Sequence, residues 1–100
     1  MKLSTYEALQ LFKALKREGL YQTIHFEIRA QQRGFTMEDV FEVAENGVMT
    51  KKSPKYNPKY DNWSYTIMGK DIDGNKIHIT FVITPDRRIK LITGYKFNIT

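Results

Sequence analysis

The sequence contains no cysteine, which excludes a disulfide framework and any metal site built from thiolates. Its two histidines, His25 and His78, stand in no spacing typical of zinc ligands, so we expect neither a metal nor another cofactor. No run of about 18 apolar residues, the length of a membrane-spanning helix, occurs in the chain, and the N-terminus has no apolar signal-peptide core. The sequence therefore predicts a cytoplasmic protein without a membrane span.

The 100 residues are enough for one domain, residues 1–100, and too few for two. Their net charge of +5 is unevenly distributed. Residues 1–47 carry six Lys and Arg against seven Asp and Glu, whereas residues 48–100 carry ten against four. A near-neutral half followed by a basic half favours a polyanion-binding face.

Capping residues, glycines and apolar spacing predict three helices in the first half. These helices lie within Ser4–Gly19, Thr23–Gly34 and Thr36–Gly47. A short strand at residues 48–52 follows, and then a loop or edge segment with Pro54 and Pro58, which cannot donate to a strand ladder. Longer strands are predicted at residues 63–70, 76–84 and 89–97. The predicted fold is α+β, with about three helices on one antiparallel, meander-type sheet of three to four strands.

The middle one of these longer strands has two different faces. The more apolar face consists of Ile77, Ile79, Phe81 and Ile83. His78, Thr80, Val82 and Thr84 form the other face, which can shelter a cleft. One face must pack on the helices, and the alternation leaves open which one it is.

Three side chains that can bind anions share one stripe of the second helix. His25, Arg29 and Arg33 are spaced four residues apart, so successive side chains drift by only about 40° around the helix axis. The functional hypothesis is a cationic edge at a cleft. The alternative is that the two arginines are solvated charges near the helix C-terminus, where the helix dipole favours cations.

A second basic segment begins after the third helix. Its cations are Lys51, Lys52, Lys55 and Lys59, and they alternate with Tyr56, Tyr60 and Trp63. Cations paired with aromatic stacking platforms are typical of proteins that bind single-stranded nucleic acids. The alternative is an edge strand protected by lysines, with a solvated loop.

Several of these residues stand in a pattern that resembles a known family. His25 is followed by Arg29, by Arg33 with a glycine after it, and by Thr36 at the start of a new helix, and the segment NWSYTIMGKDIDGNKIHITFVI comes later. Over residues 3–97 this pattern resembles a prokaryotic domain of unknown function. That domain is grouped with the RelE-like and MqsR-like RNase toxins, in the superfamily that includes barnase, EndoU and the colicin nucleases.

The resemblance implies a RelE/MqsR-like fold and the toxin of a type II toxin–antitoxin pair, acting as a metal-independent endoribonuclease (an mRNA interferase). The implied partners are RNA and a small zinc-finger antitoxin of the MqsA/YgiT type, or another antitoxin. The similarity to MqsR-like toxins includes the pair Tyr95-Lys96 in the last strand and a lysine early in the sheet, Lys51 or Lys52.

RNA cleavage without a metal needs a base for the 2′-hydroxyl, an acid for the 5′-oxygen and fixed cations for the charge on phosphorus. Histidine suits the first two roles, because its pKa lies near neutrality, and arginine suits the third. The predicted catalytic residues are His25, Arg29, His78, Tyr95 and Lys96. The predicted RNA-binding residues are Arg33, Lys51, Lys52, Lys55, Lys59, Tyr60, Trp63 and Tyr65.

A non-catalytic module of the same fold is the competing hypothesis. It binds RNA or a protein through the segment from Lys51 to Trp63 and leaves RNA intact. Geometry separates the two hypotheses, because a catalytic histidine must share a phosphate-sized site with a cationic side chain.

Overall fold

The computed structural model describes residues 2–15, 20–51 and 53–97, and within them the chain forms three helices and six strands. In chain order these are α1 (Thr5–Leu15), β1 (Leu20–Gln22), α2 (Ile24–Arg33), α3 (Met37–Asn46), β2 (Val48–Met49), β3 (Lys55–Asn57), β4 (Asn62–Lys70), β5 (Lys76–Ile83) and β6 (Ile89–Phe97). The predicted α+β class and the three helices are confirmed. Among the described residues, no helix combines the length and the apolar character that crossing a membrane requires.

Capping boxes fix the start of α1 and of α3. At α1 the Glu7 N–H donates to Ser4 Oγ at 3.1 Å, and the Ser4 N–H donates to Glu7 Oε1 at 3.3 Å. Thr36 and Asp39 form the same reciprocal pair at α3. Both boxes satisfy backbone N–H groups that would otherwise lack partners, as the sequence predicts. The predicted end of the first helix, Gly19, lies outside the described residues.

Thr23 attaches the start of α2 to the sheet. Its hydroxyl accepts a hydrogen bond from the Phe26 N–H at 3.0 Å and donates one to the Leu91 carbonyl of β6, also at 3.0 Å. The helix ends at Gly34, which has a left-handed conformation with φ of 74°. These contacts hold α2 alongside β6.

The sheet is larger than predicted and is mixed rather than antiparallel. Its strand order is β1-β6-β5-β4-β2, and β3 also pairs with β4. β1 runs parallel to β6, whereas the other pairs are antiparallel. The prediction missed β1 because three residues are too few to show an alternating pattern. The prediction of a loop or edge around Pro54 corresponds to the short edge strand β3.

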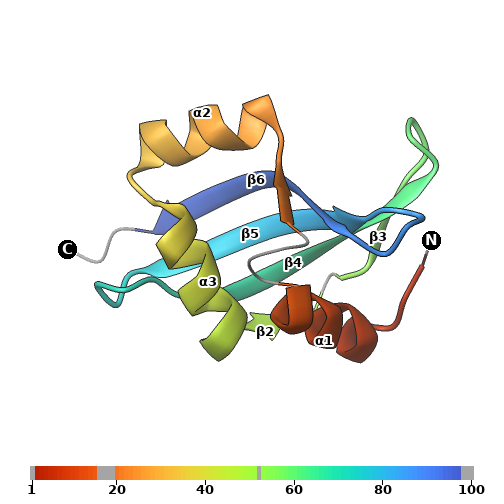
Figure 1. The fold of residues 1–100 in the computed structure, drawn as a ribbon, viewed down its shortest axis with the longest axis horizontal. Coiled ribbons are helices and arrows are strands. Elements are labelled where there is room, and N and C mark those ends of the chain that lie inside the picture. The colour runs from red at the N-terminus through yellow and green to blue at the C-terminus, as the bar shows by residue number, and fades with distance from the viewer. Residues whose placement is uncertain (1, 16–19, 52, 98–100) are drawn as a thin grey trace.

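The helices cover one face of the sheet (Figure 1). α3 crosses the middle of this face, α1 lies near β2 and β4, and α2 runs along β6. The side chains on this face are apolar and form the core. They include Phe12, Phe26, Phe35, Val40, Val43, Ile67, Ile77, Ile79, Phe81 and Leu91.

None of the helices in the described residues lies on the opposite face of the sheet, which is called the open face below. Strand alternation places His78, Thr80 and Val82 of β5 on this face, because Ile77, Ile79 and the other odd-numbered positions point into the core. The register adds these side chains of the neighbouring strands: Ser64, Thr66 and Met68 of β4, and Lys90, Thr93, Tyr95 and Phe97 of β6. The alternation left open which face of β5 packs on the helices. In the structure the face with Ile77 and Ile79 does so, and the face with His78 is the open one.

A bulge interrupts β6. Thr80 pairs with Thr93, but its neighbour Phe81 pairs with Leu91, so Ile92 is an extra residue without a partner in β5. Because of this extra residue, Lys90 and Tyr95 both point to the open face although they are five positions apart.

Candidate nucleic-acid interface

A hollow on the open face brings together His78, Arg33 and Tyr95. Its volume is about 530 Å³. The other residues that line it are Thr66, Thr80, Thr93, Gly94 and Phe97. We call it the His78 hollow. Its floor consists of hydroxyl-bearing strand residues, and its rim consists of one cationic and two aromatic side chains.

A second hollow continues from the first across the sheet. The two share Thr66, His78 and Thr80, so they form one trough over the open face. The second hollow has a volume of about 910 Å³ and extends to Lys51 and Lys55 at the β2 and β3 side. The trough therefore has Arg33 at one end and two lysines at the other, an arrangement that suits an anionic chain laid across the sheet.

His78 is the ionisable side chain at the centre of this trough. It is half-buried, and its Nε2 atom is buried with no hydrogen-bond partner in the part of the chain that the structure describes. The Phe97 ring packs edge-on against the imidazole, with 4.8 Å between ring centroids. Burial, helped by the nearby Lys76 ammonium, lowers the pKa of His78 below its ordinary value, so the ring is neutral at pH 7. A neutral imidazole can accept a proton at its unprotonated ring nitrogen.

Arg33 is held in a fixed position at the rim. Its guanidinium donates a hydrogen bond to the Gly94 carbonyl and lies over the Tyr95 ring, with 4.9 Å between Cζ and the ring centroid. Gly94 belongs to β6, so this contact joins the last turn of α2 to the strand. Because these two contacts already restrict the guanidinium, it loses little further conformational freedom when it binds a phosphate.

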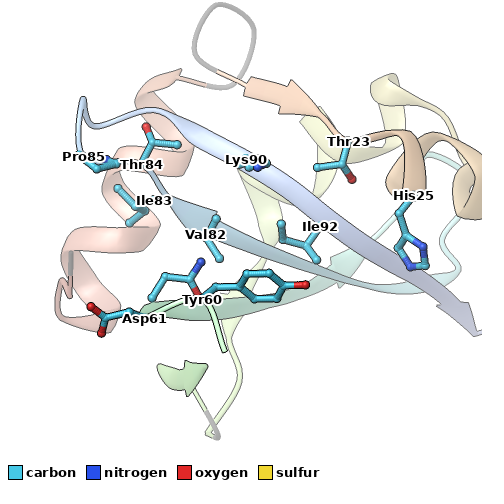
Figure 2. A pocket seen from close by; sticks show the side chains of 11 residues that line it. Thr23, His25, Tyr60, Asp61, Val82, Ile83, Thr84, Pro85, Lys90 and Ile92 are labelled. Atoms are coloured by element: carbon cyan, nitrogen blue, oxygen red, sulfur yellow. The ribbon is translucent and has the colours of Figure 1, made fainter. Parts of the chain in front are cut away.

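The other members of the predicted stripe lie elsewhere. His25 is exposed and lines a third hollow, of about 530 Å³, at the other end of the open face (Figure 2). Arg29 lies between His25 and Arg33 on α2 and donates a hydrogen bond to Gln32 Oε1 at 3.2 Å. Arg29 is not among the lining residues of the three hollows. The stripe thus follows the β6 edge, and the two predicted histidines do not share a hollow.

Lys96 and Tyr65 point to the side of the sheet that carries the helices. The Lys96 ammonium donates to the Gly34 carbonyl at 3.1 Å and pairs with Asp71 Oδ2 at 3.3 Å. Tyr65 is fully buried, and its hydroxyl accepts from the Leu3 N–H at 2.6 Å and donates to the Leu3 carbonyl at 2.8 Å. Both side chains stabilise the fold, and neither lines the trough.

The residues predicted to bind RNA around β3 are divided among three places. Lys51 and Lys55 line the trough, and Lys52 lies outside the described residues. Lys59 is exposed beside Tyr60, with its Nζ 5.4 Å from the ring centroid. Trp63 is half-buried against the core and the Tyr56 ring, so its ring is not a free stacking platform.

The trough also contains residues that the sequence analysis did not select. Thr66, Thr80 and Thr93 form its floor, and the hydroxyls of Thr66 and Thr80 lie 3.0 Å apart. Phe97 closes its side. The alternation of His78 with Thr80, and of Tyr95 with Phe97 and Thr93, was the signal that would have found them, because residues two apart on a strand share a face. Within residues 2–15, 20–51 and 53–97, no group of three acidic, histidine or cysteine side chains is placed to hold a metal ion.

Comparison with known proteins gives one family. A family model described as a domain of unknown function, DUF4258, matches residues 23–96, a range that contains α2 and every strand of the open face except β1. No curated protein matches the chain, and no solved structure matches it. The match contains no link to the RelE-like or MqsR-like toxins, so that part of the resemblance remains a proposal. The chain belongs to the DUF4258 family.

Proposed function

We propose that this chain is a metal-independent endoribonuclease that binds single-stranded RNA in the trough on the open face. The observation that carries the proposal is that His78, Arg33 and Tyr95 line one hollow, which contains a proton acceptor, a fixed cation and a hydroxyl. These are the three groups that cleavage through a 2′-hydroxyl requires. The resemblance to RelE-like and MqsR-like toxins supports the same activity and extends the proposal to a toxin restrained by an antitoxin.

The proposed reaction is an internal transesterification. The His78 imidazole removes the proton of the 2′-hydroxyl through the ring nitrogen that faces the trough, and the 2′-oxygen forms a bond to the adjacent phosphorus. The bond from phosphorus to the 5′-oxygen breaks, and that oxygen takes a proton from the Tyr95 hydroxyl, which is restored through solvent. The products are a 2′,3′-cyclic phosphate and a 5′-hydroxyl end.

Arg33 has the electrostatic role in this proposal. Negative charge accumulates on the non-bridging oxygens as the 2′-oxygen attacks, and a guanidinium stabilises it with paired N–H donors. Its contacts with Gly94 and Tyr95 hold the group in place before the substrate arrives. Lys51 and Lys55, at the far end of the trough, then bind phosphates of the flanking nucleotides.

The test is cleavage of end-labelled single-stranded RNA by the purified chain in excess chelator. We expect cleavage products with 2′,3′-cyclic phosphate ends, and we expect His78→Ala to reduce the rate by a factor of about 10² to 10⁴. Arg33→Ala should reduce it by a factor of about 10² to 10³. Arg29→Ala is the matched control, because it removes the same charge from the same helix one turn away and should leave the rate within about threefold.

Two outcomes contradict the proposal. Cleavage that persists in His78→Ala, purified in the same way, would assign the activity to another residue or to a contaminant. Intact RNA, bound tightly by the chain and less tightly by Lys51→Ala, would favour the non-catalytic binding module instead. The trough with its terminal lysines supports that second function without any chemistry at His78.

A further inference from the structure

The third hollow on the open face has no role in the proposed cleavage. We infer that this hollow is a base-binding subsite, which receives one nucleobase of the RNA strand a few nucleotides from the bond that is cut. The inference rests on the proposed function for its ligand, single-stranded RNA. It is called the Tyr60 hollow below.

The Tyr60 hollow has an apolar floor between two polar walls. Val82 and Ile92 form the floor, and Pro85, in the turn after β5, lies at one end (Figure 2). His25, at the start of α2, lies at one wall, and the hairpin between β3 and β4 forms the other. An apolar slot with a few polar groups at its edges matches the two sides of a base, which is flat and apolar on its faces and polar at its rim.

Tyr60 provides the stacking surface. Its side chain is 68% exposed, and it extends into the hollow with its hydroxyl toward the side on which His25 lies (Figure 2). An aromatic ring that the fold leaves this exposed, over an apolar floor, is a platform for another flat ring. Nothing in the core requires Tyr60 at this position.

The hairpin that carries Tyr60 is braced. The Tyr56 hydroxyl donates to Asp61 Oδ1 at 2.6 Å, and the Asn57 amide donates to Asn62 Oδ1 at 3.0 Å. Asp61 has a left-handed conformation with φ of 47°, which turns the chain directly after Tyr60. The ring is therefore presented by a fixed turn, which reduces the entropy lost when a base stacks on it.

Cations beside the hollow suit the phosphates that flank a bound base. Lys90 points to the open face next to Val82, with which it pairs in the register of β5 and β6. Lys59 lies with its Nζ 5.4 Å from the Tyr60 ring centroid. Two carboxylates stand at this end, Asp61 in the hairpin and Asp86 next to Pro85, and each already accepts a hydroxyl, that of Tyr56 and that of Thr84 respectively. The field at the hollow therefore favours an anionic nucleotide over an uncharged aromatic ligand.

The position of the hollow relative to His78 fits one continuous strand of RNA. Val82 and His78 are on the same face of β5, four residues and thus about 13 Å apart. That distance corresponds to a few nucleotides of extended single strand. A base held at Tyr60 would therefore fix which phosphate reaches His78.

The experiment that tests the subsite is a titration of the isotope-labelled chain, followed by amide chemical shifts. The probes are the four ribonucleoside 5′-monophosphates, ribose 5-phosphate and inorganic phosphate. We expect the nucleotides to shift the amide signals of Val82 and Ile92, and the two probes without a base to leave these two signals unchanged. Tyr60→Ala should weaken this binding by about tenfold or more.

Matched variants separate stacking from general effects. Tyr6→Ala removes a tyrosine that is 71% exposed on α1 and should not change the titration. His78→Ala should also leave binding at the Tyr60 hollow unchanged. In the cleavage assay, Tyr60→Ala should relax the base preference at one fixed position relative to the cut, while the products keep their cyclic phosphate ends.

Other results would contradict either the base subsite or the proposed nuclease activity. Equal shifts with ribose 5-phosphate or phosphate, or nucleotide shifts confined to the His78 hollow, would overturn the base subsite. RNA cleavage without base-dependent shifts would overturn the subsite and leave the proposed function standing. Base-dependent shifts at Val82 and Ile92 without any cleavage would leave the subsite standing and refute the nuclease.

Discussion

Replacing Tyr65 with phenylalanine should destabilise the protein while leaving its RNA-binding surface unchanged. Tyr65 is fully buried on the helix side of β4, and its hydroxyl makes two hydrogen bonds, with the N–H and the carbonyl of Leu3. Phenylalanine fills the same volume but leaves both Leu3 groups without that partner. The variant therefore measures the attachment of the N-terminal segment to the sheet.

The magnitude follows from the two bonds. A hydrogen bond of this kind contributes about 1 kcal/mol, so the pair contributes about 2 kcal/mol to the free energy of unfolding. For a domain of this size, that loss corresponds to a decrease in Tm of about 8–16 °C. RNA affinity, measured well below the Tm, should not change, because Tyr65 lies on the face opposite the trough.

Urea unfolding followed by the fluorescence of Trp63, the one tryptophan in the sequence, provides the assay. The midpoint should fall with the slope unchanged, since the unfolding reaction exposes the same surface. Tyr6→Phe is the control, because the Tyr6 side chain is largely exposed. A change below about 0.5 kcal/mol in Tyr65→Phe, within the usual range for surface substitutions, would refute the assignment of Tyr65 as a structural anchor.

Three further predictions concern the core and the trough. Lys96→Met should lower stability by about 1–3 kcal/mol in urea titrations, because it removes the ion-pair partner of the buried Asp71 carboxylate; unchanged stability would contradict this. Gly94→Ala should cost about 1–3 kcal/mol, because the added methyl group overlaps Phe35 Cζ; a native-like Tm would show that the ring moves freely. The folded pKa of His78 is lowered, so the unfolded state binds more protons below pH 6.5, and stability should decrease as pH falls through that value. His78→Gln should reduce that decrease, and an NMR titration that places the His78 pKa at or above 6.5 would contradict the assignment.

The Asp71 carboxyl adds a second pH dependence at lower pH. Burial by itself would raise its pKa, but the Asn75 N–H and the Lys96 ammonium outweigh burial and lower the pKa below its ordinary value. Because the folded pKa is the lower one, the stabilisation is present above the ordinary value near 3.8 and is lost as pH falls below it. Asp71→Asn removes this carboxyl, so the free energy of unfolding should decrease less steeply as pH falls below that value, measured by urea unfolding at a series of pH values. An unchanged slope would contradict the lowered pKa of Asp71.

Much of the fold could be predicted from local signals. The caps at Ser4, Thr23 and Thr36, and the glycine after Arg33, define helix ends through contacts that lie within a few residues. The alternation along β5 is also a local signal, and it separated the residues of the core face from those of the His78 face. β1 could not be found, because its pairing with β6 joins residues about 70 positions apart in sequence, and three residues carry too little pattern.

The site was harder to predict because it depends on which face each strand residue occupies. Tyr95 and Lys96 were predicted to act together, yet neighbouring residues on a strand point to opposite faces, and the structure separates them accordingly. The same rule placed Tyr65 with Ile67 in the core. Helical spacing grouped His25 with Arg33, but α2 is long enough to carry them to different hollows.

The extra residue in β6 has a consequence for how this chain tolerates change in length. Deleting Ile92 would leave Lys90 and Tyr95 four positions apart, so regular alternation would keep both on the open face and the strand would lose only its bulge. Deleting a residue elsewhere in β6, with the bulge kept, would instead turn the strand beyond that point over and move its open-face side chains to the helix side. The bulge is therefore a point in β6 where the strand can lose a residue while both faces of the sheet keep their side chains.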